Sequence, residues 1–125
     1  MREIKFRAYI GYYADGNKDN DAKIIDFTLY QLTPELLNVI DGWSVVQYTG
    51  LKDKNGKEIY EGDIVKYQDS VACIEQDVEH TGFRFRWIDN QSHLGSLTWH
   101  SGMLHIHVYE IIGNIYENHD LVPNA

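Results

Sequence analysis

The chain has 125 residues, with 11 Lys and Arg against 19 Asp and Glu, which gives a formal net charge of −8 at pH 7. This length predicts a single domain over residues 1–125, with a core large enough to fold without disulfides. The acidic balance argues against nucleic acid as a partner, because binding a polyanion needs clustered cations; a basic protein surface, or one that normally binds DNA, matches it better.

Two N-terminal segments, residues 3–10 and 23–30, alternate between apolar and polar side chains, which predicts a hairpin of half-buried strands around a polar loop at 13–22. The expected inward side chains are Ile4, Phe6, Ala8 and Ile10 in the first segment and Ile25, Phe27 and Leu29 in the second, with Lys5, Arg7 and Tyr9 facing outward.

The loop resembles a calcium-binding loop in part. Oxygen-bearing side chains stand at alternate positions, with an acid at the twelfth, at Asp15, Asn17, Asp19, Asp21 and Asp26. However, Asn20 stands where an EF-hand has glycine, Lys18 intrudes, and strands are expected on both sides in place of helices. We therefore favour a solvated hairpin loop over a metal site in Asp15–Asp21.

A short helix is predicted over residues 34–41. Thr33 is a suitable N-cap, Pro34 suits the first helical position, and Gly42 suits the end. Leu36, Leu37 and Ile40 would pack against the β structure, so we expect the helix to form a lid on it.

The sequence pattern in the centre of the chain predicts a strand at 43–48, followed by a hairpin. Asp53 and Asn55-Gly56 fit a tight turn, with apolar residues on both sides. Gly62 suits a sharp corner before a strand at 64–67. Three carboxylates surround this corner, at Glu58, Glu61 and Asp63. Catalytic use of such acids needs a defined separation in a cleft, so we favour turn and capping roles for them.

Residues 47–65, QYTGLKDKNGKEIYEGDIV, closely resemble the signature of the YopX family of phage and prophage proteins. Residues 1–8 are similar to the start of that family and residues 112–118 to its end. The chain departs from the pattern at Tyr9-Ile10 and at His119. The resemblance implies a β-rich, barrel-like domain capped by a helix, in bacteria or their phages, and it implies no activity and no catalytic residues.

Further strands are predicted at 71–78, 83–87 and 110–116, the last of them broken by Gly113-Asn114, with a hairpin formed by 96–100 and 104–109. The neighbours of Cys73, the single cysteine, are apolar, which indicates a buried thiol in a reducing compartment. Phe83, Phe85 and Trp87 alternate with Arg84 and Arg86, so the aromatic side chains are expected in the core and the arginines outside. A base-stacking surface for nucleic acid is the alternative.

Three histidines form a second possible metal site. His105 and His107 leave one face of a predicted strand, and His100 is expected across the hairpin, so three imidazoles would be able to hold zinc. Because Leu104, Ile106 and Val108 take the apolar face, we favour a solvent-facing row. The remaining histidines, His80, His93 and His119, are expected in loops.

These observations favour a mainly β chain, a small barrel-like antiparallel sheet capped by one short α-helix. We expect a non-enzymatic phage or prophage accessory protein that binds a protein partner or assembles with its own copies, without cofactor, metal or catalytic residues. A nucleic-acid-binding barrel is the alternative, and a metal-dependent enzyme the third possibility. The absence of a signal-peptide pattern or a membrane-length apolar run predicts a cytoplasmic location.

Overall fold

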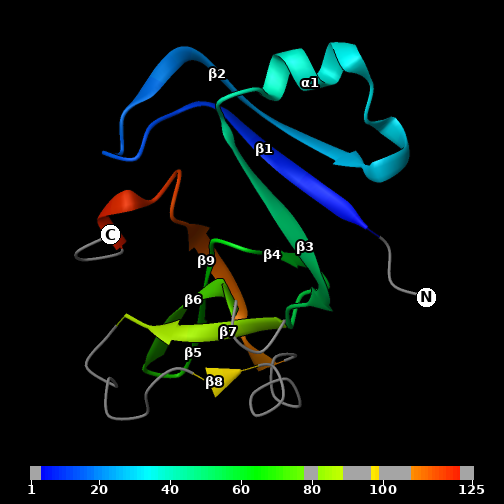
Figure 1. Ribbon diagram of the computed structural model, residues 1–125. Helices are drawn as coiled ribbons and strands as arrows, with labels where there is room; N and C mark the ends of the chain where they lie inside the picture. Colours follow the sequence, from blue (N-terminus) through cyan, green and yellow to red (C-terminus); the bar gives the residue numbers. More distant parts are fainter. Residues whose placement is uncertain (1–3, 78–81, 89–96, 99–107, 122–125) are drawn as a thin grey trace.

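The computed structural model describes residues 4–77, 82–88, 97–98 and 108–121, and these form a mainly β structure with one α-helix (Figure 1). The described elements are β1 (Lys5–Tyr12), β2 (Lys18–Thr28), η1 (Leu29–Gln31), α1 (Pro34–Ile40), β3 (Ser44–Lys52), β4 (Glu58–Tyr60), β5 (Asp63–Tyr67), β6 (Ser70–Asp77), β7 (Gly82–Trp87), β8 (Leu97–Thr98), β9 (Glu110–Asn114) and η4 (His119–Leu121). The predicted fold class is confirmed. Within the described ranges, no helix is long and apolar enough to cross a membrane.

The described strands pair as two antiparallel sheets and do not close into one barrel. The first sheet has the order β2-β1-β3-β4, and the second has the order β8-β7-β6-β5-β9. In Figure 1 the second sheet lies below the first sheet, and α1 lies above the first sheet. The chain passes from one sheet to the other at Glu61 and Gly62, so the central stretch of the sequence joins the two layers.

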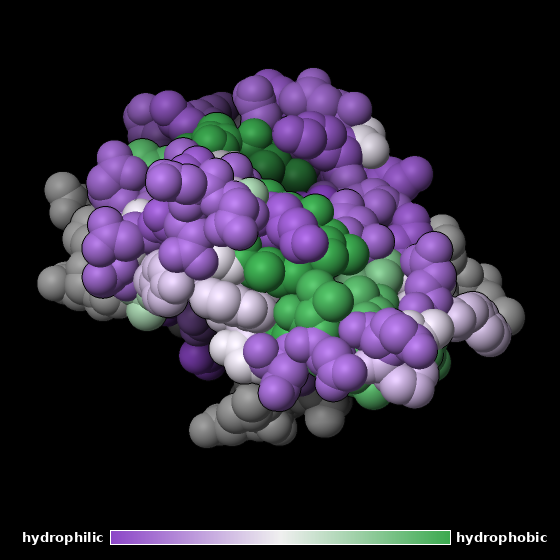
Figure 2. Space-filling model, turned by 90° about the horizontal axis from the view of Figure 1, so that it is seen from above, coloured by the Kyte–Doolittle hydropathy of each residue, from purple (hydrophilic) through white to green (hydrophobic). Residues whose placement is uncertain are grey.

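The helix α1 begins where the sequence predicts. The Thr33 hydroxyl accepts a backbone N–H at 3.1 Å, and Pro34 occupies the first helical turn. Ile40 is buried with Ala8, so α1 covers the outer face of the first sheet. The predicted packing of Leu37 is wrong, because its side chain is 49% exposed. Figure 2 looks onto this end of the molecule and shows apolar side chains exposed between polar ones.

Tyr9 is buried, although the alternation placed it on an outward, polar face of β1. Its ring stacks on that of Tyr116 with 4.1 Å between the centroids, and Tyr48 and Tyr60 belong to the same cluster. Burial raises the pKa of Tyr9. Because Ala8 is buried on the opposite face, β1 is covered on both sides: α1 packs on one face and an aromatic layer on the other.

The core of the second sheet is formed by side chains from β4 to β7 and by Tyr109. Phe83 and Phe85 point into it, as the alternation in β7 predicts, and Ile59 contributes from the first sheet. Cys73 is buried on β6, as expected, and burial raises the pKa of its thiol to about 11. Burial and the raised pKa both disfavour a reactive thiolate at this position.

The predicted turn between β3 and β4 is confirmed. Gly56 has φ +81° and donates its N–H to the Asp53 carbonyl at 3.0 Å. The Asp53 carboxylate, only 5% exposed, accepts the N–H groups of Asn55 and Lys57 at 2.9 Å. It also accepts the N–H of Ile111 at 3.0 Å, 58 residues away. Burial opposes its ionisation, but the three N–H donors hold the pKa of Asp53 below its usual value.

The predicted corner at Gly62 is also confirmed. Its φ is +91°, a conformation that only glycine adopts without strain. Its N–H donates to the Ile74 carbonyl at 2.7 Å, and its carbonyl accepts from Ile115 at 2.9 Å. A Cβ atom here would lie 3.1 Å from the ring of Tyr116. The corner therefore needs glycine both for its backbone angle and for close packing.

Replacing Gly62 with alanine is expected to lower the free energy of unfolding by about 2 kcal/mol, since strain at positive φ adds to a close contact. Gly56→Ala is the matched control, because Gly56 has a similar φ but no atom within 4 Å of the added Cβ. Urea unfolding of both variants measures the difference. Equal losses would mean that the contact with Tyr116 contributes nothing.

Several local predictions are wrong. The expected loop 13–22 is short, because β2 begins at Lys18 and only a tight turn around Gly16 joins it to β1. Ile4 and Leu29, expected inward, are about half exposed. The last strand, by contrast, ends at Asn114, at the break that the sequence predicts, and a hydrogen-bonded turn begins there. Leu97–Thr98 pairs with β7, and residues 99–107 of the expected hairpin lie outside the described ranges.

Candidate functional site

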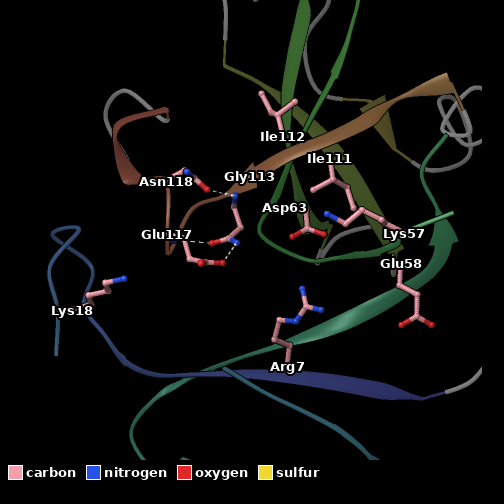
Figure 3. Close-up of a pocket in the computed structure, with 11 residues that line it drawn as sticks. Arg7, Lys18, Lys57, Glu58, Asp63, Ile111, Ile112, Gly113, Glu117 and Asn118 are labelled. Atoms are coloured by element: carbon pink, nitrogen blue, oxygen red, sulfur yellow. Dashed lines mark hydrogen bonds between the residues drawn. The ribbon is translucent and has the colours of Figure 1, made fainter. Parts of the chain in front are cut away.

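A polar groove of about 610 Å³ lies between the first sheet and β9. The charged side chains that line it are Arg7, Lys18, Lys57, Glu58, Asp63 and Glu117. They come from both sheets and from the turn after β9, so the groove exists only when the two layers are assembled (Figure 3). Its walls carry both signs of charge, which suits hydrogen bonding to a polar group more than the burial of an apolar ligand.

Asp63 and Arg7 point towards one another across the groove (Figure 3). Asp63 is only 3% exposed, and one of its oxygens accepts the Tyr60 N–H at 2.8 Å. Burial raises the pKa of Asp63 to about 7, although this backbone bond and Arg7 act in the opposite direction. A carboxyl group with such a pKa is able to exchange a proton near neutral pH.

Arg7 is held by two further contacts. Its guanidinium forms two hydrogen bonds with the Asp26 carboxylate, at 2.7 and 3.1 Å, and lies 4.0 Å from the ring centroid of Tyr60. Both contacts fix the side chain where it faces Asp63. Arg7 was not predicted as a groove residue, because its partners are 19 and more positions away and no local pattern brings them together.

Glu58 and Glu61 are the other two carboxylates singled out in the sequence, and they lie in different environments. Glu58 forms an ion pair with Lys5 at 2.5 Å. Glu61 is half-buried at the corner and does not line the groove, and burial raises its pKa. Of the three acids, Glu58 and Asp63 thus share the groove, and each has a structural partner there. The bond from Tyr60 to Asp63 is a turn bond of the kind we favoured, whereas the contact of Glu58 with Lys5 is an ion pair between distant strands.

One wall of the groove is the turn that follows β9. The Asn114 side-chain oxygen accepts the N–H groups of Tyr116 and Glu117 at 3.0 and 2.8 Å, and its amide donates to Glu117 at 2.8 Å. The Asn118 side chain accepts the Asn114 N–H at 3.1 Å. A Cβ atom on Gly113 would lie 2.4 Å from this Asn118 oxygen, so a side chain at that position would displace the Asn118 side chain and its hydrogen bond.

The chain is similar to known proteins over nearly its whole length. The model of the YopX protein family matches residues 4–122. The chain belongs to the YopX family. The crystal structure of protein EF1440 from Enterococcus faecalis is similar, with a TM-score of 0.55 and 22% identity over 98% of this chain and 99% of that one. At this identity the likeness shows the fold alone. The comparison with curated proteins found no match.

The two arginines of β7 both bind an acid on β6, the neighbouring strand of the same sheet. Arg84 and Arg86 flank the Glu75 carboxylate and donate to it from their Nε atoms at 2.7 and 2.9 Å. The single carboxylate balances half of the pair's positive charge and orients both guanidinium groups. This contact gives no support to the base-stacking alternative, which would need the guanidinium groups to face phosphates or bases.

Several candidate metal ligands are hydrogen-bonded to other groups, and others lie outside the described ranges. Asp15 accepts the backbone and side-chain N–H groups of Asn17, and Asp19 accepts the Tyr13 hydroxyl. Within the described ranges, no three His, Cys, Asp or Glu side chains converge on a common point. His119 lies in η4, where its ring packs against Gly16. The predicted histidine positions His80, His93, His100, His105 and His107 lie outside the described residues.

An apolar surface on the α1 side of the YopX fold was not singled out in the sequence. It is formed by five exposed side chains of one segment, and we call it the helix-side surface: Leu29, Tyr30, Leu32, Leu37 and Val39. Tyr30 is 98% exposed, which is far from the usual environment of a tyrosine ring. Large exposed apolar side chains mark protein interaction sites where they gather on one face of a molecule.

Proposed function

We propose that this protein is a non-enzymatic accessory protein of phage or prophage origin that acts in the bacterial cytoplasm by protein–protein contact. Its partner is another protein or a further copy of the same chain. The observation that carries the proposal is the helix-side surface, where Tyr30 and Leu37 stand exposed on one short segment. Tyrosine is enriched among the few residues that carry most of the binding energy of an interface.

Other observations support parts of this proposal. The resemblance to YopX proteins favours phage or prophage origin, and the similar structure comes from a bacterium. A single buried cysteine, Cys73, fits a reducing compartment. The structural contacts of Glu58 and Asp63 favour a stabilising role for these acids over a catalytic one.

A photo-crosslinking experiment tests the function. Replacing Tyr30 with benzoylphenylalanine and irradiating bacteria that produce the protein is expected to yield covalent adducts, because this side chain would lie in an interface. Tyr67, an exposed tyrosine on β5, is the matched control position. Immunoblotting detects the adducts, and mass spectrometry shows whether the second component is another protein or the same chain. Absence of adducts at position 30, or equal yields at both positions, would contradict the proposal.

A further inference from the structure

The acids that line the polar groove each accept a hydrogen bond from the protein, whereas two of its cations have no ion-pair partner. The acids with a donor are Glu58, Asp63 and Glu117. The two cations, Lys18 and Lys57, have exposed side chains, and neither forms an ion pair in the described ranges. The groove therefore offers positive charge to a ligand.

Donors from three elements meet near Asp63. The side chains of Arg7 and Lys57 both point towards its carboxyl group (Figure 3). Asp26 takes two of the five N–H donors of the Arg7 guanidinium, so further donors remain on this side chain. One Asp63 oxygen accepts the Tyr60 N–H, and the other, Oδ1, has no hydrogen-bond partner in the described ranges. When the carboxyl group is protonated, Oδ1 is able to donate to a ligand.

We propose that this groove binds a phosphate ester of a small molecule, and that Arg7, Lys57 and the protonated carboxyl of Asp63 hold its phosphate group. Guanidinium and ammonium groups are common partners of phosphate. The volume of about 610 Å³ is within the range of small-molecule sites, so the rest of the ligand lies along β9. This inference goes beyond the proposed function, because it concerns a different part of the molecule from the helix-side surface.

The geometry and charge of the groove disfavour other ligands. A carboxylate has two oxygens in one plane, whereas the oxygens of a phosphate group are arranged tetrahedrally and take donors from several directions. A cationic ligand would be repelled by Arg7 and Lys57. A nucleic acid strand would place many phosphates against a chain with a net charge of −8, which a single phosphate group avoids.

Binding of this kind depends on the protonation of Asp63. An ionised carboxylate would repel the phosphate group, and a protonated one donates to it. Because the pKa of Asp63 is about 7, its protonated fraction falls from roughly 0.9 at pH 6 to roughly 0.1 at pH 8, and the affinity is expected to fall about tenfold. The other charged and titratable groups around it are Arg7 and Tyr9 on β1, Asp53 and Lys57 in the β3–β4 turn, and Lys18, Glu58 and Glu117 in the groove wall.

Sulfate is the first probe, because it is a tetrahedral dianion whose charge does not change between pH 6 and pH 8. Its binding to the isotope-labelled full chain is measured by NMR titration at a constant ionic strength of about 0.15 M, through the amide shifts of Tyr60 and Lys57. We expect millimolar binding at pH 6 and about tenfold weaker binding at pH 8. Acetate is expected to bind more weakly than sulfate at pH 6, and glycerol 3-phosphate more tightly than sulfate at pH 7.

Variants locate the binding. Asp63→Asn keeps an oxygen for the Tyr60 N–H and presents an amide donor at every pH, so its affinity for sulfate is expected to be equal at pH 6 and pH 8. Lys57→Gln is expected to weaken sulfate binding roughly fivefold through the loss of one charged donor. The matched control is Lys66→Gln, at an exposed lysine of β5 that does not line the groove, and it is expected to change little.

Several results would overturn the phosphate site. They are the absence of saturable sulfate binding at pH 6, equal affinities of the natural chain at both pH values, and equal losses in Lys57→Gln and Lys66→Gln. A pH dependence that persists in Asp63→Asn would assign the titrating proton to another group, such as His119. Acetate binding as tight as that of sulfate, or glycerol 3-phosphate binding no tighter, would overturn the ligand class. The same amide shifts with single-stranded DNA would assign the groove to nucleic acid in place of a small molecule.

Discussion

Replacing Asp53 with alanine is expected to lower the free energy of unfolding by roughly 4 kcal/mol. The buried carboxylate accepts three backbone N–H groups, and each hydrogen bond to a charged acceptor contributes roughly 1.5 to 3 kcal/mol. The loss also detaches the hairpin from β9, because the N–H of Ile111 would have no carboxylate to donate to. Urea unfolding followed by tryptophan fluorescence measures the change.

Two comparisons make this prediction specific. Asp69→Ala makes the same chemical change at an exposed position in the turn between β5 and β6, and it is expected to cost less than about 0.5 kcal/mol. Asp53→Asn keeps one acceptor oxygen and is expected to give an intermediate loss. A result in which Asp53→Ala and Asp69→Ala unfold at the same urea concentration would mean that the carboxylate does not hold the hairpin.

Features determined within a few residues were predictable from the sequence. The turn at Asp53 and Gly56, the Thr33 cap and the alternation in β7 each depend on neighbouring side chains, and all three are observed. The start of β2 was missed because its charged residues are typical of loops. An exposed edge strand tolerates such charges, and they prevent pairing with other chains, so the polar composition did not exclude a strand.

Features that depend on distant contacts were not predictable. Tyr9 is buried because Tyr116, 107 positions away, stacks on it, and the periodicity of β1 contains no sign of this second layer. The groove likewise combines Arg7 and Asp63 from different sheets. The helix-side surface was missed for a different reason. Leucines such as Leu37 in a short helix normally pack, and only the structure shows that α1 covers the sheet with Ile40.

The protonation of Asp63 is expected to make stability depend strongly on pH. Its pKa is raised from 3.8 to about 7 in the folded protein, so the folded state keeps the proton over a range in which the unfolded chain releases it. Between about pH 4 and pH 7, the free energy of unfolding therefore falls by up to about 1.4 kcal/mol per pH unit from this group, or roughly 4 kcal/mol in total. Above about pH 7 the contribution is constant.

Asp63→Asn removes this dependence while preserving an oxygen that accepts the Tyr60 N–H. The difference in unfolding free energy between the variant and the natural chain is expected to rise in favour of the variant from pH 4 to pH 7 and then to level off. Urea unfolding at a series of pH values measures it, with Asp69→Asn as the control for removing one exposed carboxylate. A difference that does not change with pH would show that Asp63 is ionised in the groove and that Arg7, across from it, compensates its burial fully.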